Sequence, residues 1–399
     1  MSLEHIEKAN SQTKSKSVIN NPRYRALIYQ LILLICLGYF FYSIVSNALS
    51  NMEARGIKSG FGFLFTTAGF DILMSLIPYE ATDTYGRTFL VGLLNTILVS
   101  VIGIFLATII GFALGIAYFS KNWLIRKASI IYVEIFRNIP LLLQVFFWYF
   151  AVLAALPSVK GSLSLFESIF LNVRGLFLPA VVDEPGSNLV YLALTIAIAI
   201  VVYLKKWSSR RQDETGEQFP LLRVSIAILI GIPTLATLLT GVPFHLDYPV
   251  LGRFSLSGGT TVIPELMALS IALSIYCGAF IAEAVRAGIQ AVPNGQIEAA
   301  RSLGLNERKI MSLIIVPQAM RVIMPLLNSE YQSLVKNSTL ATAIGYPDLF
   351  TVFVGTSLNQ TGQAIEIVFM TMAVYFVINM SISLIMNLFN AKVALAERK

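Results

Sequence analysis

Residues 298–317 of this chain read EAARSLGLNERKIMSLIIVP and lie between two long apolar segments. Pro293 restricts the residue before it, and Asn294 is placed to cap the first turn of a short helix. Ile297, Ala300 and Leu303 recur every three residues and are expected to form the apolar side of that helix. A helix of barely three turns is marginal alone, so we expect it to pack against another element.

A turn and a second helix are expected in the same stretch. Gly304 favours a left-handed stop after the first helix, and Asn306 is placed to cap the second. The apolar side of the second helix comprises Ile310, Leu313 and Ile314. The stretch holds no catalytic cluster, so it predicts a contact surface. A helix lying on lipid is the alternative.

The composition indicates that the solvent of this protein is the lipid bilayer. Of 399 residues, 56% are hydrophobic and 13% are charged, and the mean hydropathy is +0.73. No soluble domain is so apolar. Cys36 and Cys277 lie far apart inside apolar runs, which excludes a disulfide framework.

Few residues in the chain are suited to catalysis. Because His5 and His245 are the only histidines, we expect no metal site and no acid–base centre. Glycine is nowhere followed by lysine, so there is no P-loop of the usual type. We expect this chain to be non-catalytic and to hold no cofactor, and any ATP to bind to another chain.

Eight apolar runs are long enough to cross a membrane, so the sequence predicts an all-α integral membrane protein. The runs are residues 27–49, 88–119, 130–156, 188–204, 221–241, 262–283, 323–344 and 366–389. A signal peptide competes for the first run, which is too long for a signal core and is expected to be retained. The seventh run is the weakest, and a broken or re-entrant segment is an alternative there. Residues 165–182 fit a folded outer loop better than a span.

Lysine and arginine are divided unequally between the two sides of these spans. Twenty-one of the 29 lie on the side of both termini and of residues 298–317, and six lie on the other side. Because basic loops stay in the cytoplasm, both termini are expected there, with residues 1–26 and 390–399 as tails. Topology thus explains the net charge of +7, and we expect no nucleic-acid partner.

The second run carries a stripe of small residues at four-residue intervals: Gly103, Ala107, Gly111 and Gly115. Small residues at this spacing allow helix backbones to approach closely. We expect them to serve packing, either within the chain or against a partner chain.

The stretch 298–317 resembles the EAA signature of the permease subunits of ATP-binding-cassette (ABC) importers. Its fixed positions occur at the family's offsets, although Val316 replaces the usual leucine. In that family this loop is a coupling helix that docks into a cleft of an ATPase subunit, which binds ATP and Mg²⁺. The resemblance implies that the ATPase-coupling residues are Glu298, Ala299, Ala300, Leu303, Gly304, Ile314 and Pro317.

Three further motifs look like those of polar amino-acid permeases: YVEIFRNIPLL at 132–142, AEAVRAGIQAVP at 282–293 and KNSTL at 336–340. The resemblance places an ABC type-1 permease module at residues 88–389. It implies a soluble binding protein that delivers solute, a paired ATPase, and a second permease that is a different chain.

The chain departs from the minimal module in two places. Residues 27–87 add a span and a periplasmic loop, and residues 157–258 form an insertion with two further spans. The motifs GFDI at 69–72, TYGR at 84–87 and NVRGL at 172–176 resemble a permease subunit of the general L-amino-acid uptake systems of bacteria. This resemblance implies location in the bacterial inner membrane, in contact with lipid. No role of the insertion follows from the sequence.

Two pairs of opposite charges lie near the cytoplasmic ends of their spans, namely Glu134 with Arg137 and Glu283 with Arg286. Helical neighbours three residues apart can form ion pairs, and a charge inside a bilayer needs a partner or a wet cavity. One interpretation is two local ion pairs that reach the interface. The other is a cytoplasmic gate, to which Asn138 would also belong.

The run 323–344 is unusually polar because it contains Asn328, Glu330, Gln332 and Lys336. This polarity suits a helix that lines a solute route, and polar packing between helices is the alternative. Glu330 and Lys336 are six residues apart and are not expected to share a helix face. Lys336 would suit the carboxylate of an amino acid, and Glu330 its ammonium group.

The sequence therefore predicts a subunit that forms half of the membrane pathway of an ATP-driven amino-acid importer working by alternating access. An ion-coupled secondary amino-acid transporter is the alternative, which would carry coupling carboxylates in mid-membrane. A membrane enzyme is disfavoured because the residues for its chemistry are missing. Which amino acids are carried does not follow from the sequence.

Overall fold

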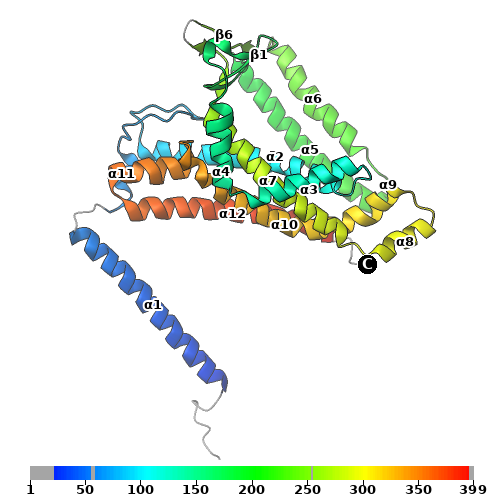
Figure 1. The fold of residues 1–399 in the computed structure, drawn as a ribbon, viewed down its shortest axis with the longest axis horizontal. Helices are drawn as coiled ribbons and strands as arrows, with labels where there is room; N and C mark the ends of the chain where they lie inside the picture. Colours follow the sequence, from blue (N-terminus) through cyan, green and yellow to red (C-terminus); the bar gives the residue numbers. More distant parts are fainter. Residues whose placement is uncertain (1–21, 55–58, 253–254, 395–399) are drawn as a thin grey trace, which may run out of the picture.

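The computed structural model describes residues 22–54, 59–252 and 255–394 (Figure 1). Residues 1–21 and 395–399 of the two expected tails lie outside the described part. Within it, seven helices are long and apolar enough to cross a membrane, or eight if one bent pair counts as a span. The expectation of a helical membrane protein with about eight spans is confirmed.

The long helices are α1 (Pro22–Ala54), α2 (Tyr85–Ala117), α5 (Ser187–Thr215), α6 (Leu221–Leu239), α7 (Pro264–Gln290), α10 (Val316–Asn337) and α12 (Ala364–Ala394). The shorter helical segments are η3 (Phe61–Phe65), α3 (Trp123–Asn138), α4 (Leu141–Phe146), η4 (Phe147–Leu153), η5 (Val159–Gly161), α8 (Asn294–Ser302), α9 (Glu307–Ile310), η6 (Met311–Ile315), η7 (Ser338–Ala343), η8 (Phe350–Ser357) and α11 (Leu358–Thr361). α1 stands apart from the bundle (Figure 1), and none of its apolar stretch is buried.

Helix α7 is the centre of the bundle, where it packs against α2, α10 and α3. Of the stripe of small residues on α2, Ala107, Gly111 and Gly115 face α7, whereas Gly103 faces Leu334 of α10. A Cβ atom on Gly111 would come within 2.4 Å of Ile281 Cγ2, and one on Gly115 within 2.6 Å of Val285 Cβ. The expected packing role of the stripe is therefore confirmed within the chain, and α2 and α7 form a rigid pair.

The expected span over residues 130–156 is not one straight helix. α3 and the segment formed by α4 and η4 meet at 105°. Pro140 has no N–H to donate, and Ile139 before it is extended (φ −93°, ψ 126°). Gln144 Nε2 donates to Phe136 O and Ile139 O, both at 3.0 Å, so the bend leaves these two carbonyls satisfied.

The C-terminal part contains a helical segment that the sequence did not predict. α10 continues without a break through η7, so the broken or re-entrant alternative for residues 323–344 is not observed. After η7 the chain turns at Gly345 (φ +76°) and forms η8 and α11. Asn95 Nδ2 donates to Pro347 O at 2.9 Å, which fixes this turn against α2.

Strands form a cap at one end of the bundle, as expected for a folded outer loop at 165–182. An antiparallel sheet runs in the order β1 (Leu163–Leu165), β2 (Ile169–Asn172), β3 (Gly175–Leu178) and β8 (Thr260–Val262). Two further antiparallel pairs are present. One joins β4 (Ala180–Asp183) to β5 (Phe244–Asp247), and the other joins β6 (Val250–Leu251) to β7 (Leu256–Ser257). Because β3 pairs with β8, this sheet ties the start of the insertion to the start of α7.

Candidate functional site

The residues expected to couple to an ATPase lie at the end of α7 opposite the strand cap (Figure 1). There α8, α9 and η6 form one projecting segment, residues 294–315, which we call the coupling segment. Its base is buried: Ala300 is 3% exposed and Ile310 0%, and both belong to the main hydrophobic core. The base of the segment therefore packs into the bundle.

The turn of the coupling segment follows the sequence prediction. Gly304 has φ +76°, and its N–H donates to Arg301 O at 2.9 Å. Asn306 Oδ1 accepts from Lys309 N at 2.9 Å and so caps α9. The first helix differs from the prediction because Pro293, not Asn294, is its N-cap residue, and no side chain caps it.

The exposed surface of the segment also differs in part from the prediction. Glu298 and Ala299 are exposed, as a contact surface requires. Leu303, expected on the packed side with Ile297 and Ala300, instead projects with 81% of its surface exposed. Ala300 lies in the core, so its side chain packs within this chain and does not face a partner.

The remaining members of the expected coupling set lie nearby. Ile314 is half-buried against the core, and Pro317 is exposed in the first turn of α10. An ion pair joins α8 to α9, with 2.9 Å between Arg301 Nε and Glu307 Oε1. The hydrogen bond from Arg301 lowers the pKa of Glu307 below its usual value. Both side chains are more than half exposed, so the pair orders the surface more than it stabilises the fold.

The charged residues of α3 and α7 form one cluster and not two separate pairs. Arg286 Nε donates to Glu283 Oε2 at 2.9 Å, as predicted. The predicted pair of Glu134 with Arg137 does not form. Instead, Arg137 Nη1 lies 3.9 Å from Glu283 Oε2. Glu283 therefore holds an arginine on each side, one on its own helix and one on α3.

Aromatic rings complete the charged cluster. Arg286 lies over the ring of Tyr118, and Arg137 over the ring of Phe280, each 5.2 Å from the ring centroid. Glu134 lines the same 220 Å³ cavity as Arg137, Glu283 and Arg286. Asn138 Nδ2 donates at 2.7 Å to the backbone oxygen of Glu134, so this amide is occupied within its own helix.

A second cavity, of about 250 Å³, lies between α7 and α10. Glu330 and Lys336 both line it, although they are six residues apart on α10. α7 contributes Tyr276, Cys277 and Phe280 to the same cavity. Sequence reasoning missed these residues, because no spacing rule within one helix identifies what a neighbouring helix presents.

Phe280 connects the two cavities, because Arg137 of the first cavity lies over its ring and Phe280 itself lines the second. Charged groups thus extend from the last turn of α3 and the Gln290 half of α7 to the last turns of α10. Asn328 and Gln332 are not in the lining of the second cavity. They bond to each other, with 3.1 Å between Gln332 Nε2 and Asn328 Oδ1.

Comparison with known proteins identifies close relatives. Residues 219–395 match the family model described as binding-protein-dependent transport system inner membrane component. The chain is 49% identical over 392 residues to the putative amino-acid ABC transporter permease protein YhdX of Escherichia coli (strain K12), covering 97% of this chain and 99% of that protein. It is 48% identical over 383 residues to the general L-amino acid transport system permease protein AapQ of Rhizobium johnstonii, covering 96% of each. A solved structure, "Crystal structure of an amino acid ABC transporter with histidines", aligns with a TM-score of 0.46 at 21% identity, covering 77% of this chain and 95% of that one.

Proposed function

The chain belongs to the family of binding-protein-dependent transport system inner membrane components, and we propose that it forms half of the solute pathway of an ATP-driven amino-acid importer. It is a multi-pass permease subunit of the inner membrane and does not itself catalyse a reaction. The printed names of the two relatives support amino acids as the solute class.

The observation that carries the coupling role is the shape of the coupling segment. Its tip exposes Glu298, Ala299 and Leu303, while its base is locked into the core through Ala300 and Ile310. An exposed leucine on a rigid projection suits insertion into a cleft of another protein, because burial of its side chain there is favourable by about 1.5–3 kcal/mol. We assign that cleft to an ATPase subunit, which binds ATP and Mg²⁺.

The solute route is assigned to the two cavities that Phe280 connects. Glu330 and Lys336 carry opposite charges in the same cavity, which suits the ammonium and carboxylate of an amino acid. The cluster around Glu283 lies between this cavity and the end of the bundle that bears the coupling segment. It is placed to act as a gate, because parting α3 from α7 would break the contact between Arg137 and Glu283.

The other parts of the assembly follow from this assignment. A second permease, a different chain, forms the other half of the pathway, and a periplasmic binding protein delivers the amino acid. The excess of basic residues supports a cytoplasmic position of the coupling segment and of both termini.

Two measurements on the full complex test the proposed function. The tagged chain is expected to co-purify with an ATPase subunit, and uptake of labelled amino acids into cells should survive collapse of the proton gradient while ATP is maintained. Uptake that stops with the gradient, from a chain that captures no ATPase, would identify an ion-coupled transporter and refute the proposal.

A further inference from the structure

A third cavity, of about 940 Å³, lies at the end of α7 away from the coupling segment. α7 has 27 residues, so about 40 Å of helix separates the two. Residues 73–75 before α2, η4, the turn between β2 and β3, and the first turn of α7 line this cavity, together with residues of β3, β7 and β8. Two of these parts belong to or follow motifs noted in the sequence, GFDI at 69–72 and NVRGL at 172–176. Neither motif has a role in the proposed coupling segment or gate.

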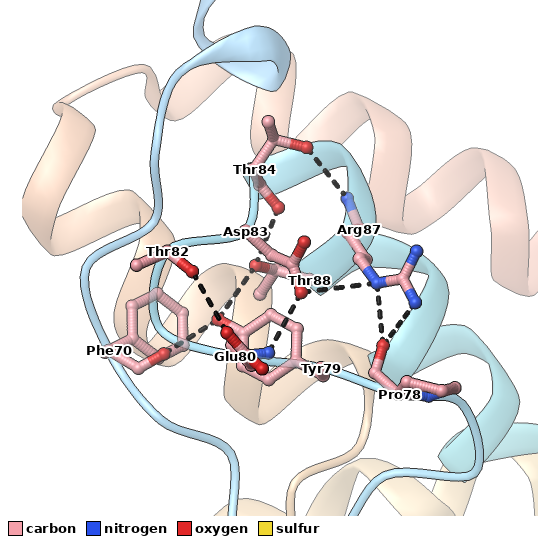
Figure 2. Close-up of polar contacts among 9 residues, drawn as sticks. All are labelled: Phe70, Pro78, Tyr79, Glu80, Thr82, Asp83, Thr84, Arg87 and Thr88. Carbon is pink, nitrogen blue, oxygen red and sulfur yellow. Dashed lines mark hydrogen bonds and ion pairs between the residues drawn. The ribbon is translucent and has the colours of Figure 1, made fainter.

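The segment before α2 forms one wall of this cavity, and its conformation is fixed by hydrogen bonds. Figure 2 shows how it is held: Arg87 Nε donates to Pro78 O at 2.7 Å and lies 3.3 Å from Asp83 Oδ2, and Tyr79 Oη donates to Phe70 O at 2.7 Å. Asn95 Nδ2 of α2 donates to Met74 O at 2.8 Å. These bonds fix residues 73–75 at the edge of the cavity.

The turn between β2 and β3 is equally constrained. Asn172 is fully buried; its Nδ2 donates to Ser162 Oγ at 2.9 Å, and its Oδ1 accepts from Arg174 N at 2.8 Å. Gly175 has φ +124°, and a Cβ there would come within 2.3 Å of Val262 O. The motif NVRGL thus builds a rigid turn that carries Arg174 at the cavity, where its guanidinium forms no ion pair with any described residue.

A carboxylate faces the same cavity. Tyr149 Oη donates to Glu265 Oε1 at 2.8 Å, but Glu265 Oε2 is buried and has no hydrogen-bond partner among the residues that the structure describes. A buried acceptor without a donor is costly, so it is a position where a donor from a ligand gains free energy. Glu265 lies in the first turn of α7, where the helix dipole favours a negative charge.

We propose that this cavity is a receiving site for a free amino acid, whose ammonium group binds Glu265 Oε2 and whose carboxylate binds Arg174. The proposal rests on the proposed function, which supplies the solute class. The site is separate from the cavity of Glu330 and Lys336 and lies at the other end of the pathway. Apolar residues such as Leu153 and Phe177 line the remaining space, which is within the usual volume range of ligand pockets and leaves room for different side chains.

Direct binding to the purified complex without binding protein tests the proposal. Radiolabelled L-glutamine is bound to the complex in lipid nanodiscs and competed with L-alanine, with alaninamide, which lacks the carboxylate, and with propionate, which lacks the ammonium group. We expect only alanine to compete well. Glu265→Gln and Arg174→Met should each weaken L-glutamine binding by about tenfold or more. Lys160→Met, an exposed cation near the cap that does not line the cavity, should bind as the wild type does.

Several outcomes would overturn the inference. They are the absence of saturable binding to the wild-type complex, unchanged binding in both variants, and loss of binding in Lys336→Met alone. If the variants lose uptake only with the binding protein present and still bind L-glutamine, the cavity is a docking surface for that protein. Arg174→Met decides the matter if Glu265→Gln fails to assemble. ATP-driven uptake by the wild type, measured in parallel, reports on the proposed function separately.

Discussion

The two ends of α7 carry opposite kinds of surface. At the Gln290 end the coupling segment is convex, made from one continuous stretch, and exposes Leu303 on a buried base. At the Pro264 end the surface is concave and is assembled from pieces that lie far apart in the sequence. The difference agrees with the two proposed roles. The coupling segment, a local projection, would transmit force, whereas the cavity formed by several segments would bind a small solute. The tight contact of α2 with α7 joins the two ends.

The largest effect is expected from Gly304→Val at the convex end. A β-branched residue at φ +76° strains the turn by about 1–3 kcal/mol, although no neighbour blocks its Cβ. We expect a folded membrane protein whose ATP-driven uptake falls more than about tenfold and which no longer stimulates the ATPase. Gly304→Asn, which tolerates this conformation, should retain most activity. Normal coupled uptake by Gly304→Val would remove the functional contrast between the two ends.

Lys336→Met probes the cavity between the ends. It removes the positive charge opposite Glu330 while keeping a long side chain, so uptake is expected to fall about tenfold with protein level unchanged. The matched control is Lys206→Met, an exposed lysine of α5, which should transport normally. If uptake and protein level both stay normal in Lys336→Met, this lysine has no transport role.

A smaller effect is expected for the charged cluster. Glu283→Gln leaves Arg137 and Arg286 without their shared carboxylate, and we expect a change in transport rate of about two- to fivefold, because these side chains are partly exposed. Glu214→Gln is the matched control, since Glu214 is an exposed carboxylate of α5 that does not line the cavity of this cluster. Equal effects of the two substitutions, measured as initial uptake rates, would contradict the gate assignment.

The smallest effect is expected for Glu307→Gln, which breaks the exposed ion pair with Arg301. Because Arg301 lowers the pKa of Glu307, the pair's contribution is complete above the ordinary glutamate pKa of about 4.3 and is lost as the pH falls through the lowered value. At pH 7 the Tm of the variant complex should match the wild type within error, and any difference should shrink further in high salt. A large loss of Tm would show that this pair supports the segment more than its buried base does.

The convex end was predictable because its signals are local. Gly304 and Asn306 act on backbone within a few residues, and both behave as predicted. The same pattern predicts Asn294 as the cap of the first helix and Leu303 on the packed side. Pro293 instead occupies the N-cap position and Leu303 is exposed, because helix boundaries and phase near a terminus shift by a residue without changing the pattern.

The rest of the site depends on contacts between distant parts of the chain. Arg137 forms its ion pair with Glu283 on another helix and not with Glu134 on its own. Glu330 and Lys336 line one cavity together with residues of α7. Glu265 and Arg174 are 91 positions apart in the sequence and meet at one cavity only through the pairing of β3 with β8. Periodicity within a segment carries no information on such pairings.

The strand pair at the base of the α5–α6 hairpin has a consequence for how this chain tolerates its extra length. Asp183 of β4 lies opposite Phe244 of β5, so the backbone leaves the cap and returns to it at adjacent points. α5 and α6 are each long and apolar enough to cross a bilayer, and an even number of crossings leaves the direction of every later helix unchanged. A hairpin of this kind can be gained or shortened during evolution without inverting the machinery downstream of it.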